Sequence, residues 1–187
     1  MGKAGGNQTG PAATETTGER DLLERLRRGD AAAAAEFYAG TARRIHRYLA
    51  QALGVRFAPE ADDLLHETFI ALAERLPYFR GESSLFTFAC AIAHRKVASF
   101  LRTRSRRERR EAAEEDAAAV PAAEGDADVR RALERLSPED REMLFLKYVE
   151  AMSVTEIAGV VGASEHAVES RLARARRRFR RSLEGLR

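Results

Sequence analysis

The strongest constraint on the fold is a stretch near the C-terminus, residues 153–181, which predicts two helices joined by a tight turn. Ser153 and Glu156 have the spacing of a helix-capping pair. Gly162 can take a positive φ, and Ser164 can cap the next helix. Apolar residues recur at helical spacing in both halves: Val154, Ile157, Ala158 and Val161, then Val168, Leu172, Ala175 and Phe179. The pattern predicts a helix-turn-helix.

The second helix of this motif leaves a polar and largely basic face outside its apolar stripe. The members of this face are Glu165, His166, Glu169, Ser170, Arg171, Ala173, Arg174, Arg177 and Arg178. Between Arg171 and the C-terminus the only acid is Glu184, and this density of arginine suits contact with phosphates. The helix is therefore a candidate for the major groove of DNA. A plain αα-hairpin with a solvated basic face is the alternative.

Cysteine usage and hydropathy restrict the compartment. Cys90 is the single cysteine, and it lies in the apolar run FACAIA without neighbours at metal-ligand spacing. We expect it to be a small buried core residue in a reducing compartment. No apolar run has the length of a membrane span, and the N-terminus lacks the order of a signal peptide. These features predict a soluble, cytoplasmic protein without direct membrane insertion.

The sequence offers little support for an enzyme. His66-Glu67 is the best seed for a zinc hydrolase, but no second histidine follows at the helical spacing that such a site needs. Neither a glycine-rich phosphate loop nor a nucleophile motif is found. We expect no catalysis, no cofactor, no metal and no small-molecule substrate.

Along the chain, helical patterns alternate with segments of distinctive composition. Residues 1–18 are poor in large apolar side chains, which predicts a disordered tail. Residues 111–128 contain seven acids and no Lys or Arg, which predicts a solvated linker. We therefore expect an all-α chain of two small helical domains, residues 19–110 and 129–187, each with a modest core, joined by this acidic flexible linker.

Within the first domain we expect four helices. A short helix ends at Gly29, and a longer one extends from an Asp30 cap to Gly54. The inward face predicted for the longer helix is Phe37, Tyr38, Ile45, Tyr48, Leu49 and Leu53. A third helix lies between Pro59 and Pro77, and a fourth begins near Ser84 and becomes strongly basic.

The segment PYFRGESS between the last two helices is expected to be a loop that displays Tyr78, Phe79 and Arg80. In the second domain, Ser137 precedes Pro138, which predicts a capped helix start. The buried side predicted for that helix is Leu144, Phe145, Tyr148 and Val149.

Taken together, several motifs in this order resemble an extracytoplasmic-function RNA polymerase sigma factor of the sigma-70 family. RRGDAAAAAEFY is similar to the first region of such factors. ADDLLHETFIAL, FRGESSLFTF and IAHRKVASFLR are similar to region 2. The long segment from LERLSPEDREML to VESRLARARRRF is similar to region 4. The resemblance covers about residues 19–183. It implies a region 2 bundle and a region 4 helix-turn-helix.

The resemblance also implies partners and roles. Core RNA polymerase, through its largest and second-largest subunits, promoter DNA and an anti-sigma factor are the implied partners. An acidic helix of region 2 would dock on a coiled coil of the largest subunit. The residues in that position are Asp62, Asp63, Leu64, His66, Glu67 and Phe69. An ordinary solvated face is the alternative for each of these residues singly.

The −10 element, as it melts, would be received by the loop and the helix that follow, because separated bases stack on rings and their phosphates need cations. The implied residues are Phe79, Arg80, Ser83, Phe88, Arg95, Lys96 and Arg102. The −35 element would be read by the basic face of the second helix described above, and Arg171, Arg174 and Glu169 are able to contact phosphates or base edges.

Four residues depart from the pattern of the family. Phe88 stands where tryptophan is frequent, and Arg95 stands where an asparagine helps to hold the flipped base. Glu169 occupies a position that is frequently basic, and Ala151 replaces a common glycine. The promoter sequence is therefore not transferable from relatives. A helix-turn-helix regulator that never contacts polymerase is the main rival, although it leaves residues 59–110 without a role.

Overall fold

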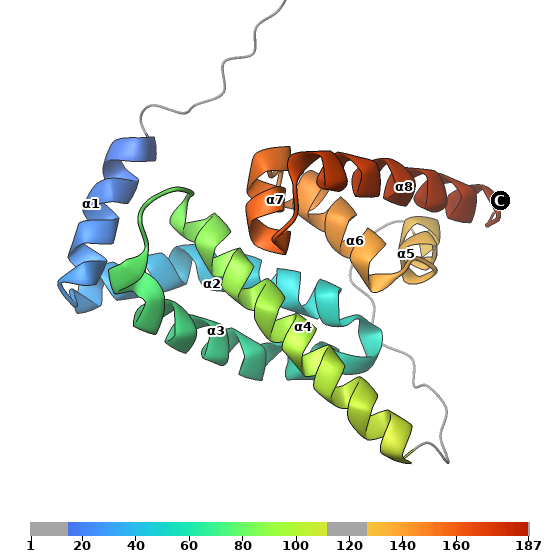
Figure 1. Cartoon of the computed structure of the whole chain (residues 1–187), viewed down its shortest axis with the longest axis horizontal. Coiled ribbons are helices and arrows are strands. Elements are labelled where there is room, and N and C mark those ends of the chain that lie inside the picture. Colours follow the sequence, from blue (N-terminus) through green and yellow to red (C-terminus); the bar gives the residue numbers. More distant parts are fainter. Residues whose placement is uncertain (1–14, 112–126, 187) are drawn as a thin grey trace, which may run out of the picture.

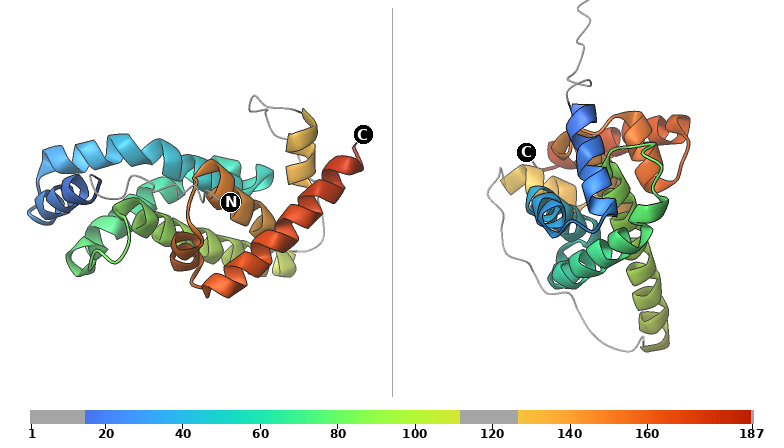
Figure 2. Two further views of the ribbon diagram at one scale, coloured as in Figure 1. Left: turned by 90° about the horizontal axis from the view of Figure 1, so that it is seen from above. Right: turned by 90° about the vertical axis from the view of Figure 1, so that its left-hand side faces the viewer.

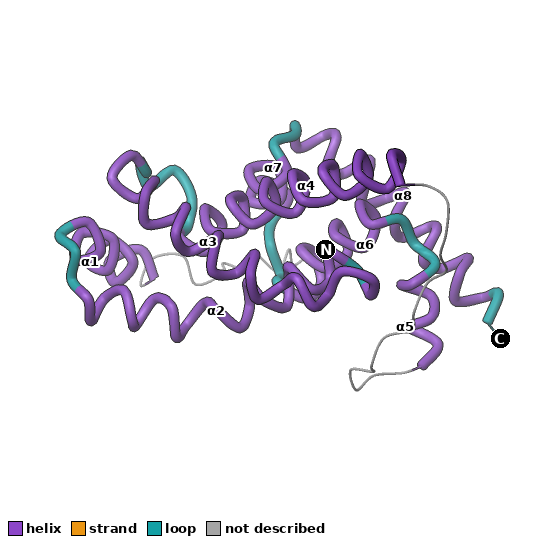
Figure 3. Tube along the Cα trace, turned by 90° about the horizontal axis from the view of Figure 1, so that it is seen from below, coloured by secondary structure: helices purple, strands orange, loops and turns teal. Residues whose placement is uncertain are grey.

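The computed structural model describes residues 15–111 and 127–186, and within these ranges it contains helices and no strand (Figures 1 and 3). The all-α prediction is confirmed. Helix α1 begins at Glu15, so the last residues of the predicted tail are helical. The rest of that tail and most of the predicted acidic linker, residues 112–126, lie outside the described residues.

The first bundle contains α1 to α4 with two short 3-10 segments between them. Their bounds are α1 Glu15–Arg27, α2 Ala31–Leu53, η1 Val55–Glu60, α3 Ala61–Arg75, η2 Leu76–Tyr78 and α4 Leu85–Glu111. The Asp30 carboxylate caps α2 by accepting from the N–H of Ala32 at 2.8 Å. Gly54 ends α2 with φ of 70°, a conformation that glycine adopts without strain.

The second bundle contains α5 Ala127–Glu134, α6 Pro138–Leu144, the π-helical segment η3 Phe145–Val149, α7 Val154–Val161 and α8 Glu165–Glu184. Ser137 caps α6, as expected. The predicted burial of Tyr148 and Val149 is wrong, because they are 60% and 50% exposed. The predicted burial of Leu144 and Phe145 is confirmed, and the wider π-helical turn that begins at Phe145 changes the register so that Leu146 is buried as well.

The expectation of two separate cores is also wrong, because the buried apolar side chains form one continuous cluster through both bundles. Helix α7 packs against α4 and α6 packs against α2, so the second bundle is seated on one face of the first (Figures 1 and 2). Tyr38, predicted to point inward, is 42% exposed, and its ring packs on Phe69 with 4.7 Å between centroids.

Candidate nucleic-acid interface

The helix-turn-helix is built by local contacts. Ser153 Oγ accepts from the N–H of Glu156 at 3.1 Å, and the Glu156 carboxylate accepts from the N–H of Ser153 at 2.8 Å. Gly162 then takes the left-handed conformation, with φ of 64°, and Ser164 caps α8. On α8, Val168, Leu172 and Ala175 are buried. The predicted capping box, turn and apolar stripe are therefore confirmed, and they fix which side of α8 faces outward.

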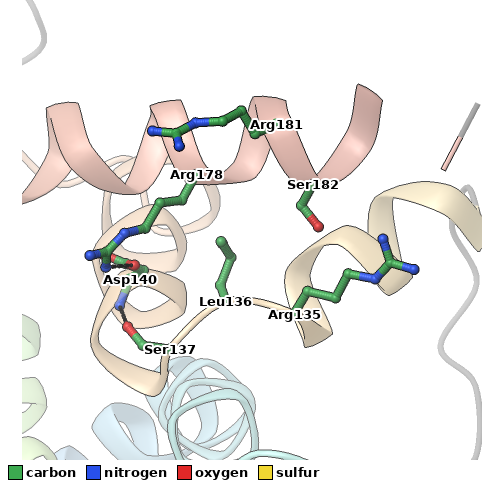
Figure 4. A pocket seen from close by; sticks show the side chains of 7 residues that line it. All are labelled: Arg135, Leu136, Ser137, Asp140, Arg178, Arg181 and Ser182. Carbon is green, nitrogen blue, oxygen red and sulfur yellow. Dashed lines mark hydrogen bonds and ion pairs between the residues drawn. The ribbon is translucent and has the colours of Figure 1, made fainter. Parts of the chain in front are cut away.

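The face of α8 predicted to read DNA is exposed, except for Ala173, which is half-buried. Two of its members have partners within the chain. Thr155 donates to the carboxylate of Glu165 at 2.8 Å, which ties the start of α8 to α7. Arg178 is ion-paired with Asp140, which is 6% exposed, and Figure 4 shows the side chain of Arg178 reaching down from α8 to α6.

This ion pair raises the pKa of Arg178, chiefly through its hydrogen bond with Asp140. In the described structure Arg178 therefore joins α8 to α6 rather than being free for a phosphate. The side chain of Arg181, one turn later on α8, lies along the upper side of the helix in Figure 4, whereas the pair of Arg178 and Asp140 lies below it. Arg174 and Arg177 have exposed side chains on the same face and remain candidates for contact with DNA.

A second basic surface follows α4. Arg80, Ser83, Arg95 and Arg102 are exposed, whereas Lys96 is half-buried and lies 2.8 Å from the carboxylate of Glu67. This ion pair joins two residues that the sequence assigned to different partners, because Glu67 was predicted to contact polymerase and Lys96 to contact DNA.

The prediction that the loop before α4 displays Phe79 is wrong. Phe79 is 8% exposed, and its ring stacks on Phe88 with 4.5 Å between centroids. The guanidinium of Arg27 also donates to the carbonyl of Phe79, which anchors the loop to α1. Phe79 is therefore a core residue in this conformation. Its neighbour Tyr78 is 83% exposed. The sequence predicts that the loop displays Tyr78, but it does not place Tyr78 among the residues that receive the −10 element.

The acidic face of α3 is largely as expected. Asp62, Asp63, His66 and Glu67 are exposed, whereas Leu64 is 6% exposed and packs in the core, so Leu64 is not available to a partner here. Phe69 is half-buried against the rings of Phe37 and Tyr38. The same surface includes an exposed apolar residue that the sequence prediction missed: Ile70, three positions after Glu67, is 62% exposed.

Among the described residues no group of three or more His, Cys, Asp or Glu side chains has an arrangement that could hold a metal ion. Over the same residues no helix combines the length and the apolar character needed to cross a membrane.

Comparison with known proteins identifies the family of the chain. Residues 37–107 match the sequence model of sigma-70 region 2, and residues 126–179 match that of sigma-70 region 4. The RNA polymerase sigma-H factor of Pseudomonas aeruginosa is 31% identical over 188 residues, which cover 90% of this chain and 95% of that protein. The ECF RNA polymerase sigma factor BldN of Streptomyces coelicolor is 30% identical over 87% of this chain and 65% of its own.

The fold is also similar to that of a solved structure. A sigma factor RpoE from Bartonella quintana, solved in complex with the anti-sigma factor NepR, superposes with a TM-score of 0.67. The match covers 80% of this chain and 96% of that one at 24% identity. The chain therefore belongs to the extracytoplasmic-function group of the sigma-70 family of RNA polymerase sigma factors. Sigma factors act in transcription by binding core RNA polymerase and promoter DNA, and the function expected from the sequence is confirmed at this level.

Proposed function

We propose that this chain binds core RNA polymerase, recognises the −35 and −10 elements of a promoter, promotes melting of the −10 region and has no catalytic activity of its own. The observation that carries the proposal is the order of three surfaces along one chain. These surfaces are the acidic face of α3, the basic surface of α4 and the exposed face of α8 in a helix-turn-helix. The assignment of domains to residues 19–110 and 129–187 is part of the proposal.

For the −35 element, we assign the reading of bases to the exposed part of the α8 face. Arg171, Arg174 and Glu169 are exposed, and they lie within the first three turns of the helix, the part of a recognition helix that enters the major groove. Arginine is able to contact guanine bidentately, and a carboxylate is able to accept from cytosine. Arg177 lies further along the same face, where contact with the phosphate backbone is the expected role.

For the −10 element, the burial of Phe79 changes the assignment. We propose that Tyr78 supplies an exposed ring for stacking and that Arg80, Arg95 and Arg102 supply positive charge along the strand. The stacked pair of Phe79 and Phe88 holds this segment in place rather than receiving a base.

For core polymerase, the proposed docking surface is the outer face of α3. Its carboxylates Asp62, Asp63 and Glu67 suit a basic helical partner, and Ile70 adds an apolar contact at the edge. Replacing Asp62 and Asp63 by alanine should weaken core binding. Because both side chains are exposed, the change should leave the melting temperature nearly unaltered. Unchanged affinity for core polymerase would remove this face from the proposal.

We also propose control by an anti-sigma factor in the cytoplasm. The support is the similarity of fold to the RpoE protein that was solved with NepR. An anti-sigma factor would cover the polymerase and DNA surfaces until a signal released it.

The test of the function is run-off transcription with bacterial core polymerase, this protein and a pool of promoter fragments from its own genome. We expect defined transcripts that start only when the protein is present, with shared sequences at the −35 and −10 positions. Binding of DNA without any initiation by a competent core would instead favour a helix-turn-helix regulator, and the roles given to α3 and to the loop before α4 would fall.

A further inference from the structure

Helix α1 holds both ends of the loop that precedes α4, residues 79–84. The guanidinium of Arg27 donates to the backbone carbonyl of Phe79, the first residue of the loop, which is 52 positions later in the chain. The carboxylate of Glu19 accepts a hydrogen bond from the backbone N–H of Leu85, the first residue of α4, which is 66 positions later. In Figure 1 the loop rises beside α1 from η2 to the start of α4. One helix thus fixes the loop where it begins and where α4 follows it.

The two side chains that make these contacts lie on the face of α1 that packs on the bundle. Glu19, Leu23 and Arg27 follow one another at intervals of four residues, which places them on one side of a helix. Leu23 lies between the other two and is 9% exposed in the core. Leu22 and Leu26 pack against the same core. Because this apolar stripe fixes α1 on the bundle, the acid and the arginine on either side of Leu23 are held next to the loop.

The contact of Glu19 completes the cap of α4. The N–H groups in the first turn of a helix have no acceptor within that helix. The local cap is Ser84, whose Oγ accepts from the N–H of Thr87 at 3.0 Å. The N–H of Leu85 donates instead to Glu19, and a carboxylate also suits the positive end of the helix dipole. The start of α4 therefore depends on a residue of α1 as well as on its own serine.

Between the two contacts the loop is exposed and has little packing of its own. Arg80, Gly81, Glu82 and Ser83 are exposed, and Gly81 takes the left-handed conformation with φ of 75°. The stack of Phe79 on the ring of Phe88 fixes only the first residue of the loop. The positions of the exposed residues therefore depend on where the two ends of the loop are held.

A loop that is already ordered binds more tightly than one that becomes ordered on binding. Fixing the backbone of each residue costs conformational entropy, and in a loop held by the fold this cost is met during folding and not during binding. If the ends of the loop were released, a bound DNA strand would have to order the loop itself. Affinity for that strand should then depend on α1, although α1 has none of the residues assigned to DNA.

We propose that Glu19 and Arg27 are positioning residues for the −10 element. They act through the backbone of Leu85 and Phe79, and they hold the loop in the arrangement in which Arg80 meets the separated strand. The inference rests on the proposed function, because it takes the loop to be part of the surface that receives the −10 element. It adds α1 to that surface as a support that does not itself contact the DNA.

The variants that test this role are Glu19→Ala and Arg27→Ala, each of which removes one contact. Glu19 is half-buried and Arg27 is exposed, so neither change leaves a large cavity. Glu19→Gln keeps an acceptor and Arg27→Lys keeps a cationic donor, so both should restore much of the contact. Glu24→Ala and Arg28→Ala are matched controls, because Glu24 and Arg28 are exposed residues of the same types that pair with each other at 2.9 Å.

The first measurement is hydrogen exchange of the Leu85 N–H by NMR, on the full chain without polymerase or DNA. In Glu19→Ala this N–H loses its acceptor, so it should exchange about tenfold faster than in the original protein. Glu19→Gln and Glu24→Ala should exchange at close to the original rate. Unchanged exchange in Glu19→Ala would overturn the proposal, whatever the protein does in transcription.

The second measurement is melting of the −10 region by the holoenzyme, on promoter fragments recovered by run-off transcription. Reactivity of unpaired thymines with permanganate reports the melted region. We expect about tenfold less melting in Glu19→Ala and in Arg27→Ala, a smaller loss in Glu19→Gln and Arg27→Lys, and no loss in the two controls. Affinity for core polymerase and for a −35 duplex should not change in any of these variants, because α3 and α8 are unaltered.

The outcomes separate this inference from the proposed function. Full melting by both alanine variants would overturn the positioning role and leave the function standing. Loss of melting together with loss of core affinity or of the helical signal in circular dichroism would also overturn it, because the residues would then act through the whole fold. An original chain that melts no promoter with a competent core would remove the proposed function, and the role of α1 in melting with it.

Discussion

Helices α7 and α8 obtain their arrangement from residues close in the sequence, whereas the segment between α3 and α4 obtains its arrangement from residues far away. Ser153, Glu156, Gly162 and Ser164 define the helix-turn-helix within a dozen positions. The segment before α4 is instead held by Arg27, which lies 52 positions before Phe79 and donates to its carbonyl. Both regions are assigned to DNA, but only the first displays the side chains that its local pattern indicates.

The difference teaches that exposure in a loop depends on partners that the local sequence does not contain. A helix with a stripe of apolar residues must bury that stripe, so its opposite face is exposed whichever element covers it. An aromatic residue in a loop has no such rule, and Phe79 is buried because Phe88, one turn into α4, offers its ring a stacking partner.

The largest effect that tests this comparison is Phe79→Ala. Removal of a buried aromatic side chain should lower the free energy of unfolding by about 3 to 5 kcal/mol. Tyr78→Ala is the matched variant, because its ring is 83% exposed, and it should change stability by less than about 0.5 kcal/mol. Urea unfolding measures both. A stable Phe79→Ala protein that fails only in promoter melting would show that the ring faces DNA after all.

The next effect concerns Arg174 and Arg178, one turn apart on α8. Arg174→Ala should weaken binding to the −35 duplex by about 1 to 3 kcal/mol if it reads a base. It should leave the melting temperature unaltered, because its side chain is exposed. Fluorescence anisotropy with a set of single-base variants measures this effect. An equal loss on every duplex sequence would mean that Arg174 contacts only phosphate.

Arg178→Ala should show the reverse behaviour. It leaves the carboxylate of Asp140 without its ion pair at a site that is 6% exposed, so the melting temperature should fall, by about 2 to 4 °C. Affinity for a −35 duplex should fall less than in Arg174→Ala when both are measured well below the melting temperature. Loss of affinity without loss of stability in Arg178→Ala would return Arg178 to the DNA-reading set.

Much of the fold followed from the sequence, and the failures share one cause. The caps at Asp30, Ser137, Ser153 and Ser164 and the end of α2 at Gly54 are fixed by neighbours within four residues, and they were predicted. The exposure of Tyr148 and Val149 depends on a π-helical turn, which no periodicity of 3.6 residues indicates.

The contact between the bundles was equally invisible in the sequence. Arg44 and Arg47 on α2 meet Glu150 more than one hundred positions later, and each of them taken alone fits an ordinary solvated face. In the candidate site, charge and amphipathic pattern predicted which faces of α3 and α8 are polar and exposed. They did not predict which arginines are already engaged, because ion pairing depends on the tertiary arrangement.

A smaller effect tests whether the helix-turn-helix depends on its local caps. Ser153→Ala removes the acceptor for the N–H of Glu156 and should lower the free energy of unfolding by about 1 kcal/mol. Ser83→Ala, in the exposed segment before α4, is the control, because Ser83 accepts no backbone N–H among the described contacts. Equal stability of the two variants would mean that packing on α4, and not the capping box, holds the start of α7.

The smallest effect concerns the cap of α2 and its dependence on pH. The pKa of Asp30 is lowered, first by its hydrogen bond with Arg25 and then by the N–H of Ala33. Since the folded state favours the charged carboxylate, its contribution is fully present above the unfolded pKa of about 4 and is lost as the pH falls through the folded value.

Asp30→Asn keeps an acceptor for the cap but removes the charge, so it isolates this contribution. The difference in stability between the original protein and Asp30→Asn should be constant between pH 8 and pH 6 and should begin to shrink as the pH falls below about 4. Urea unfolding at each pH measures it. A difference that persists unchanged at pH 3 would mean that the cap stabilises α2 through geometry alone, and the local rules that govern both bundles would then need no contribution from charge at this position.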